Sequence, residues 1–377
     1  MSLEPMRDLK IDLTAHRTCN QSREVQFMFD GMPESRSGNF SMSVITLGSA
    51  FERRNADKGY SSSAFETFRN NLDVIHQRVE AQYHGAPYPK HSKLAGQTFD
   101  PKHGTVSKYS PDVMIPAFLA TYTGRDATRT GLDFFPNLLS MLPNWRITYT
   151  GLGKLPWLSK YFRNINLNHA YRSTYAVGSY NTFQSFMSYM GNIGFVEDVQ
   201  SGNPVPTSRF DVNMVSINEQ FVPLIGVDMT WKNGMTTRLE WRMTRVMNLS
   251  MTALQLVETT SKDVVLGVGY KIVNFNSILR GTSKHKKNKS GHDLTLRTDV
   301  SFRNQSALCR DVQAGITQAT SGNKALKITC TADYNISRML TLRLYYEREQ
   351  NTPLVSSTSF PVVNADFGFS MKFSLNR

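Results

Sequence analysis

Residues 292–304, HDLTLRTDVSFRN, alternate between apolar and polar side chains without interruption. Leu294, Leu296, Val300 and Phe302 point to one side of an extended chain, with one threonine among them. Because successive side chains of a strand point to opposite faces, the segment predicts a strand that is apolar on one face and charged on the other. A soluble sheet would bury the apolar face in its core. A transmembrane barrel would turn that face to lipid and keep the charges in a wet lumen.

Similar alternation continues over residues 144–377, where the sequence predicts roughly a dozen strands, many near the 9–11 residues that cross a bilayer at a tilt. Strands of soluble proteins are usually shorter. Asn233-Gly234 and Ser321-Gly322-Asn323 have the composition of hairpin turns. The pattern therefore favours the wall of a membrane barrel over a soluble sandwich.

The N-terminal part of the chain has a different pattern. Two strand-like runs occupy residues 24–29 and 40–47, and apolar residues at three- and four-residue steps then predict an amphipathic helix over residues 63–83. Residues 112–124 and 132–145 are apolar but interrupted by prolines, which predicts short packed pieces. We expect strands over residues 1–47, a helix-containing, Pro-broken excursion off the barrel over residues 48–143, and antiparallel strands with a Lys-rich loop at 281–291 over residues 144–377.

Composition narrows the function classes. The net charge is +13, but part of the excess lies in the Lys-rich loop, and no RNA-binding or zinc-finger signature supports a nucleic-acid partner. Cys309 and Cys330 fall on opposite faces of neighbouring strands by parity, which argues against a disulfide. The first 20 residues lack the unbroken apolar core of a signal peptide, and no run is long and apolar enough for a transmembrane helix. A membrane protein of this kind would then be a barrel and a piece of a longer chain.

Catalytic chemistry is not expected. No metal-ligand spacing, nucleophile elbow or phosphate loop occurs, so we expect no catalytic residue, no metal and no cofactor. His169 lies in a strand and is expected to pack rather than act as a base. Gly267 and Gly269 lie on the face opposite Val268 and Tyr270, where a backbone bends or another chain approaches. An outer-membrane enzyme of the phospholipase or protease type stays as a minor alternative.

The polar face supplies the candidate functional residues. Charged side chains of both signs share parity with Thr and Ser, as expected for the lining of a hydrated channel or for the solvent face of a soluble sheet. The lumen-lining candidates are Arg146, Arg172, Arg238, Glu240, Arg242, Arg297, Asp299, Arg303, Lys327, Asp333, Arg343 and Lys372.

Several long blocks resemble one family. They include DVMIPAFLATYTG (112–124), INLNHAYRSTYAVGSY (165–180), INEQFVPLIGVDMTWKNGMT (217–236) and NTPLVSSTSFPVVNADFGFSMKFSL (351–375). The chain is similar to the C-terminal part of the SprA (Sov) family, the outer-membrane translocons of the Bacteroidota type IX secretion system. The similarity covers most of the chain from about residue 112.

This resemblance implies a fold, a function and partners. The fold would be an all-β antiparallel transmembrane barrel segment, one arc of a very large barrel of about 36 strands, the largest count known for such barrels. The function would be a protein-conducting channel of the outer membrane that exports folded cargo, such as gliding-motility adhesins or proteases. The partners would be a PorV-type barrel, a periplasmic plug protein, the secreted cargo and the lipid bilayer.

The chain is much shorter than members of that family, which is why we expect a C-terminal fragment. A passive outer-membrane porin of about a dozen strands and a secreted adhesive β-sandwich remain as alternatives from other classes. The porin would pair its first strand with its last. The sandwich would cover its apolar face with a second sheet.

Overall fold

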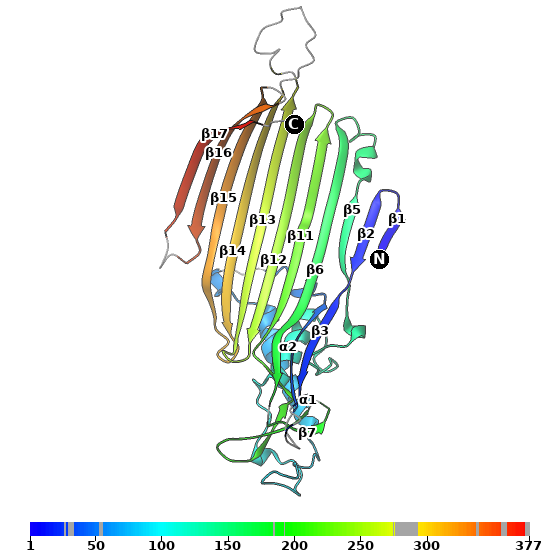
Figure 1. Cartoon of the computed structure of the whole chain (residues 1–377), viewed down its shortest axis with the longest axis vertical. Coiled ribbons are helices and arrows are strands. Elements are labelled where there is room, and N and C mark those ends of the chain that lie inside the picture. Colours follow the sequence, from blue (N-terminus) through cyan, green and yellow to red (C-terminus); the bar gives the residue numbers. More distant parts are fainter. Residues whose placement is uncertain are drawn as a thin grey trace, which may run out of the picture.

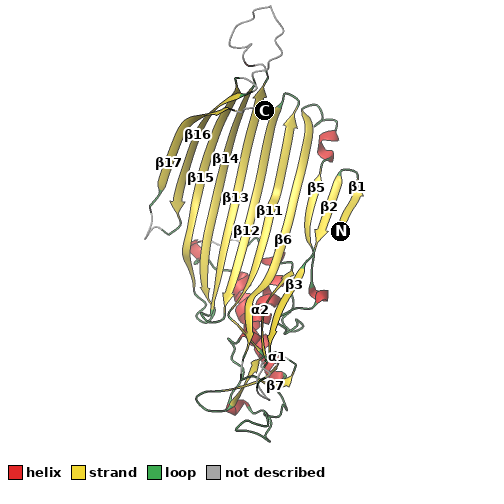
Figure 2. Cartoon of the chain, viewed as in Figure 1, coloured by secondary structure: helices red, strands yellow, loops and turns green. Residues whose placement is uncertain are grey.

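A computed structural model describes residues 1–25, 28, 34–52, 56–183, 185–191, 193–273, 275, 293–336, 339–355 and 360–373. The predicted Lys-rich loop at 281–291 and half of the predicted strand at 24–29 lie outside these residues. The main element is one antiparallel sheet of 14 strands, which is not closed into a barrel (Figure 1). The fold is therefore all-β with few helices, as Figure 2 shows.

Seventeen strands are present in the described residues, and several are much longer than predicted. They are β1 (Ser2–Met6), β2 (Leu9–Thr14), β3 (Arg17–Glu24), β4 (Ser35–Ser43), β5 (Asn144–Tyr149), β6 (Phe162–Thr182), β7 (Met187–Met190), β8 (Ile193–Glu197), β9 (Pro204–Ser208), β10 (Phe210–Val212), β11 (Met214–Trp231), β12 (Met235–Ser250), β13 (Gln255–Ile272), β14 (Leu294–Asp311), β15 (Thr317–Asn335), β16 (Leu340–Pro353) and β17 (Val362–Phe373).

The large sheet follows the order β1-β2-β5-β6-β11-β12-β13-β14-β15-β16-β17. From β11 onward each strand pairs with the next along the chain, a simple meander of hairpins. β10 and β4 also pair with β6, and β3 pairs with β4. In the described residues, β1 and β17 are the two ends of this strand order, and β3, which pairs with β4 alone, is the edge of the branch beside β6.

The helices gather at one end of the sheet (Figure 1). They are α1 (Ser63–Ala81) and α2 (Pro111–Thr123), with 3-10 turns η1 (Leu47–Ser49), η2 (Ala56–Lys58), η3 (Pro101–His103) and η4 (Leu138–Ser140), whereas η5 (Gly151–Lys154) follows β5. A separate three-stranded sheet, β7-β8-β9, packs with them: the Tyr83 hydroxyl donates to the Gly194 and Thr207 carbonyls at 3.1 Å each. We call residues 44–143 together with β7–β9 the cap, and the end of the large sheet beside it the cap end.

The predicted amphipathic helix is confirmed as α1. Its buried residues are the expected apolar ones, among them Phe65, Leu72 and Val79. Ser62 caps its N-terminus by accepting the Phe65 amide at 3.2 Å.

The prediction of short pieces over residues 112–124 is wrong, because α2 is one continuous helix through Pro116. The proline lies in the second turn and removes one backbone hydrogen bond. Ten of the helix's 13 residues are buried, and this burial outweighs the missing bond. The left-handed Gly124, with φ of 68°, ends the helix.

One predicted turn is confirmed and the other is wrong. Gly234, with φ of 90°, lies in the turn between β11 and β12. Ser321-Gly322-Asn323 lies inside β15, and the hairpin turns instead at residues 312–316, where Gly315 has φ of 73°. Gly322 serves close approach: a Cβ there would lie 2.6 Å from the Gln305 carbonyl oxygen.

The prediction for the cysteines is confirmed. Cys330 pairs in register with Thr298, on the side of β14 opposite to that of Cys309. Cys19, Cys309 and Cys330 are all free thiols.

Candidate functional site

Strand register sorts the side chains of the large sheet into two faces. Residues that lie opposite each other on adjacent strands share a face. One row runs through Trp241, Val264, Phe302 and Leu326, and the side to which it belongs is here called the apolar face. The next row, Glu240, Val265, Ser301 and Lys327, belongs to the opposite side, here called the charged face.

The apolar face is exposed away from the cap. Along β13, Val264, Leu266, Val268 and Tyr270 are each between 37% and 44% exposed. The same face exposes Ile225, Leu239, Trp241, Leu296, Phe302, Leu326, Leu344, Tyr346, Phe367, Phe369, Met371 and Phe373. We call these residues the apolar band. Across the described ranges, no second sheet covers it, so residues 294–304 leave their apolar side uncovered.

At the cap end the same face is buried by the cap. Tyr175, Ile217, Met247 and Leu256 are fully buried, and they form one hydrophobic cluster with residues of α1 and α2. On β11–β14 the apolar face is therefore covered by protein at one end and uncovered beyond it.

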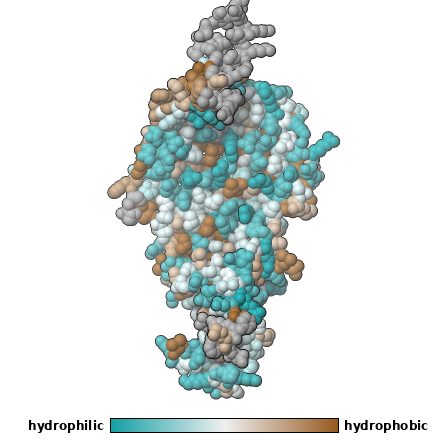
Figure 3. Space-filling model, viewed as in Figure 1, coloured by the Kyte–Doolittle hydropathy of each residue, from teal (hydrophilic) through white to brown (hydrophobic). Residues whose placement is uncertain are grey.

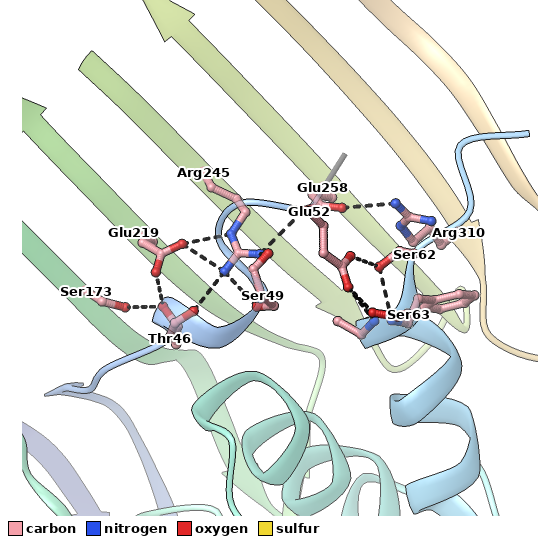
Figure 4. A network of polar contacts seen from close by, with 12 residues as sticks. Thr46, Ser49, Glu52, Ser62, Ser63, Ser173, Glu219, Arg245, Glu258 and Arg310 are labelled. Atoms are coloured by element: carbon pink, nitrogen blue, oxygen red, sulfur yellow. Dashed lines mark hydrogen bonds and ion pairs between the residues drawn. The ribbon is translucent and has the colours of Figure 1, made fainter. Parts of the chain in front are cut away.

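A buried charge network lies where the cap meets the apolar face (Figure 4). Glu219 on β11 and Arg245 on β12 form an ion pair of 2.8 Å, with side chains 0% and 1% exposed. Thr46 donates its hydroxyl to Glu219 at 2.6 Å, and Arg245 donates to the Ser49 carbonyl at 2.8 Å. Sheet charges thus hold the η1 turn of the cap directly.

A second pair anchors the start of α1. Arg310 on β14 contacts Glu258 on β13 at 3.2 Å and donates to the Tyr60 carbonyl at 3.0 Å. Its guanidinium also lies over the Phe65 ring, 5.5 Å from the centroid. Glu52 accepts the Ala64 amide at 2.8 Å, which places a carboxylate at the positive end of α1. The network fixes the cap against the wall of the sheet.

All twelve predicted lumen candidates lie on the charged face. Strand register shows this: for example, Arg146 lies opposite Asp12, Arg172 opposite Gln220, and Lys372 opposite Thr341. The face of the molecule seen in Figure 3 is mainly hydrophilic over the sheet. The alternation in the sequence therefore identified twelve residues of one continuous surface. That this surface lines a lumen stays a prediction.

Many charges of this surface pair with one another. Arg303 contacts Asp263 at 2.9 Å, Lys327 contacts Glu347 at 2.5 Å, and Arg343 contacts Asp333 at 2.5 Å. Arg238 and Arg242 both bind Glu240. By contrast, these five candidates form no ion pair with any described residue: Arg146, Arg172, Arg297, Asp299 and Lys372.

Two open hollows interrupt the charged face. One, of about 420 Å³, is lined by residues of β2, β5, β6 and β11, including Arg146 and Arg172. The other, of about 320 Å³, lies over Gly267 and Gly269 between Arg238 and Arg297. A Cβ on Gly267 would lie 2.5 Å from Asp299 Oδ1, so these glycines permit the close approach of neighbouring side chains.

His169 packs on the apolar face, as expected. Its Nδ1 lies 2.6 Å from the Leu224 carbonyl oxygen, and its ring lies 6.5 Å from that of Trp145. Among the residues that the structure describes, no group of three or more His, Cys, Asp or Glu residues is placed to hold a metal ion. None of the described helices combines the length and apolarity needed to span a membrane.

Sequence reasoning missed the buried network. A signal was present, because Glu219, Arg245, Glu258 and Arg310 are charged residues at positions that share parity with apolar neighbours. A charge in an otherwise apolar row indicates that a partner covers it.

Comparison with known proteins adds no relative. The chain matches no family model, and a search of the curated proteins also gives no match.

Proposed function

We propose that the sheet is a segment of an outer-membrane wall and that the whole wall encloses a protein-conducting channel. The observation that carries this proposal is the apolar band, which is exposed over β11–β17 while the other face of the same strands is charged. In water a surface of this size and continuity would associate or aggregate. In a bilayer it is the expected lipid-facing surface.

The height of the band fits a membrane. On β14 the apolar side chains of this face run from Leu294 to Phe302, with Thr298 among them, which is nine residues and about 26–30 Å of strand at ~3.3 Å per residue. At a strand tilt of about 40°, this length corresponds to roughly 20–23 Å of height. The apolar belt of outer-membrane barrels is about 25 Å tall. One row toward the cap, the face becomes polar with Lys262, Asn304 and Lys324, as expected where strands leave lipid. The cap then lies just outside the bilayer, against the outward side of the wall.

The two open edges support an arc rather than a complete barrel. Within the described part of the chain, β1 and β17 each pair on one side alone, and lipid supplies no hydrogen bonds to the backbone groups of the other side. We infer that further strands pair with both edges in the membrane. A wall of many strands encloses a wide lumen, which is the requirement for passing folded cargo.

The resemblance to the SprA family makes secretion the specific form of this proposal. It adds type IX export of adhesins or proteases, a PorV-type barrel, a periplasmic plug protein and the outer membrane of Bacteroidota as the location. The charged face would line the pore. Its paired charges give a hydrated surface that binds no single cargo sequence strongly.

The alternatives fit the geometry less well. A β-sandwich needs a second sheet over the apolar band, and the second sheet of the described residues, β7-β8-β9, belongs to the cap. A small porin needs its first and last strands to pair, whereas β1 pairs with β2 and β17 pairs with β16.

A crosslinking experiment in secreting cells tests the proposal. Ser301 on the charged face and Val300 on the apolar face are adjacent in β14, so they form a matched pair. Ser301→Cys and Val300→Cys would each carry a thiol-linked photo-crosslinker in a background where the native cysteines are serine. Adducts with secreted proteins are expected from position 301 and not from position 300. Equal labelling of cargo from both positions, or none from position 301, would contradict a pore on the charged face.

The membrane part of the proposal has its own readout. Trp241 lies on the apolar band and is 40% exposed. Brominated lipids should quench its fluorescence when the protein is in bilayers. If brominated lipid leaves the emission of Trp241 unchanged, the proposed membrane wall is wrong, and the proposed channel is wrong with it.

A further inference from the structure

A short connection at the end of the sheet opposite the cap exposes large aromatic side chains. Residues 151–161 join β5 to β6, and they begin with the 3-10 turn η5 (Figure 1). Trp157 is 64% exposed, Tyr161 is 63% exposed and Leu155 is 39% exposed. We call residues 155–161 the aromatic loop. Exposed apolar side chains are usually scattered singly, so this group indicates a surface that a partner covers.

The aromatic loop adjoins the apolar band. Strand register places Ile165 of β6 in the same row as Val268 of the band. Ile165 is buried, and η5 packs beside it: a Cβ on Gly153 would lie 3.3 Å from the Ile165 amide nitrogen. At the other end of the loop, Phe162 lies opposite Trp231, with the two ring centroids 4.2 Å apart. The loop therefore extends the surface that we propose contacts lipid.

The protein holds the aromatic loop at both ends. Before the loop, Lys154 forms an ion pair of 2.7 Å with Asp8 in the turn between β1 and β2. At its end, the Lys232 amide donates to the Tyr161 carbonyl at 2.9 Å. A backbone that is already held in place loses less conformational entropy when its side chains are buried in a partner.

The charges of this part of the chain are of one sign. Residues 150–165 contain Lys154, Lys160 and Arg163 and no acidic residue. Lys160 is exposed and directly precedes Tyr161. Tryptophan, tyrosine and basic residues together are typical of segments at the head-group layer of a bilayer, where rings lie at the acyl boundary and cations meet phosphate.

A lipid surface fits the aromatic loop better than a protein partner does. Complete burial of Trp157 and Tyr161 would remove at most about 500 Å² from water. A stable protein interface buries about 800 Å² on each partner. Two aromatic rings in the head-group layer need no matching surface, because lipids adapt to the shape of the rings.

We propose that the aromatic loop anchors the wall in the head-group layer of the leaflet at the end opposite the cap. Trp157 and Tyr161 place their rings at the acyl boundary, and Lys160 contacts the phosphate of anionic lipid. This inference rests on the proposed membrane position of the sheet. The loop fixes the depth of the wall at this end.

The fluorescence of Trp157 tests the anchor in the full chain reconstituted in lipid vesicles. Subtracting the emission of W157F from that of the wild type gives the contribution of Trp157, and phenylalanine keeps an aromatic ring. Lipids brominated close to the head group should quench this contribution more than lipids brominated close to the end of the acyl chain. This difference in depth is the signature of an interfacial ring.

A matched variant moves the tryptophan to the other face at the same end of the sheet. Asn164 is exposed on β6, two residues from Phe162, and its row runs to Arg297 on the charged face. In W157F/N164W, neither brominated lipid should quench the new tryptophan. The anchor is wrong if both lipids leave Trp157 unquenched, if they quench position 164 equally, or if bromine at the chain end quenches Trp157 most. Protection of Trp157 from aqueous iodide in whole outer membranes but not in vesicles would show that a protein covers the loop instead.

The role of Lys160 has a separate readout. With phosphatidylglycerol and phosphatidylcholine spin-labelled near the head group as quenchers, Trp157 of the wild type should favour the anionic lipid. One surface cation contributes about a five-fold preference, so K160Q should lose about that much. K102Q removes an exposed cation of the cap and should leave the preference unchanged. Equal losses from the two variants, or no preference in the wild type, would overturn the contact of Lys160 with anionic lipid.

Failure of the anchor can be told apart from failure of the membrane proposal. Trp241 lies on the apolar band and reports on the wall itself, through the difference between the wild type and W241F. Quenching of Trp241 without quenching of Trp157 would support the membrane wall and contradict the anchor. Absence of quenching at both positions would overturn both.

Discussion

Arg245 and Glu219 form a fully buried ion pair of 2.8 Å on the face of the sheet that is otherwise apolar. The cap covers the pair through Thr46 and Ser49, and Tyr171 of β6 donates its hydroxyl to Glu219 at 3.0 Å. Two charges in an apolar row would oppose membrane insertion, so their place under the cap separates the covered part of the wall from the lipid-facing part.

Removing one partner of this pair should detach the cap. Arg245→Met leaves Glu219 buried without a cation, which costs about 3–5 kcal/mol. Hydrogen exchange of the α1 and α2 amides should rise sharply as a result. Arg242→Met, on the same strand but on the charged face and 38% exposed, should cost at most about 1 kcal/mol. Replacing both partners, with Glu219→Leu and Arg245→Met together, should recover much of the protection. Equal exchange in the two single variants would contradict a docking role for the pair.

A charge on the apolar band should prevent insertion. Leu296 is 39% exposed on the band, and Leu296→Arg should cost about 2–4 kcal/mol near the bilayer midplane. Membrane flotation measures the inserted fraction. Thr295→Arg places the same charge one residue away on the charged face and should insert normally. A normal yield for Leu296→Arg would show that this face does not contact lipid.

Arginines of the charged face should matter for ion selectivity and not for folding. Arg297 forms no ion pair with any described residue, and Arg297→Ala should leave the thermal unfolding temperature nearly unchanged. Removing its positive charge should shift the selectivity of the complete channel toward cations. Reversal potentials under a salt gradient measure this shift. The same shift from Leu296→Ala, on the opposite face, would contradict the assignment of faces.

The cap should lose stability as the pH rises through the acidic range. Asp112 accepts the Ser208 amide at 2.9 Å, and burial raises the pKa of its carboxyl to about 6 from an ordinary 3.8. The folded cap therefore holds this proton where the unfolded chain has released it, so the free energy of unfolding falls between about pH 4 and 6 and stays low above. Asp112→Asn keeps the acceptor and should stabilise the cap by about 1–3 kcal/mol at neutral pH.

Asp126 is a control for this pH dependence, because its pKa is shifted in the opposite direction to that of Asp112. Hydrogen bonds from Thr128 lower the pKa of its exposed carboxyl, so it stabilises the fold at neutral pH and loses this effect in acid. Asp126→Asn should therefore weaken the cap slightly at neutral pH. Exchange rates of cap amides, corrected for intrinsic pH dependence, measure both variants. A stabilising effect of equal size from both substitutions would exclude burial of Asp112 as the cause.

Two turn glycines should differ in what they tolerate. Gly234 and Gly315 both have positive φ, so alanine at either costs about 1–2 kcal/mol of backbone strain. A Cβ on Gly234 meets no atom within 4 Å, whereas one on Gly315 lies 2.3 Å from the Arg69 guanidinium of α1. Because the guanidinium is the far end of a flexible side chain, Arg69 can move aside, so Gly315→Ala should lower the unfolding temperature only slightly more than Gly234→Ala. A much larger loss for Gly315→Ala, with faster exchange of the α1 amides, would show that Arg69 is held in place.

The sequence by itself determined the long strands and their two faces, because apolar and polar residues alternate along them, as they do over residues 294–303. It also determined α1 through its spacing of apolar residues, and it placed all twelve charged candidates on one surface. Prediction from the sequence failed where one residue type is compatible with two local structures. Gly322 indicated a turn but serves a close strand contact, and Pro116 indicated a break but lies in a helix that burial holds together.

Tertiary structure alone decided which stretch of the apolar face is covered. The alternation continues along the whole of β12 and β13, and only the charges at Arg245 and Glu258 distinguish the end on which the cap packs from the uncovered end. The pairing of successive strands brings Glu219 beside Arg245 and Glu258 beside Arg310, and Thr46, Ser49 and Tyr60, far away in sequence, then contact them. Burial is a property of contacts between distant segments, and a charge becomes a docking contact only when such a segment excludes water from it.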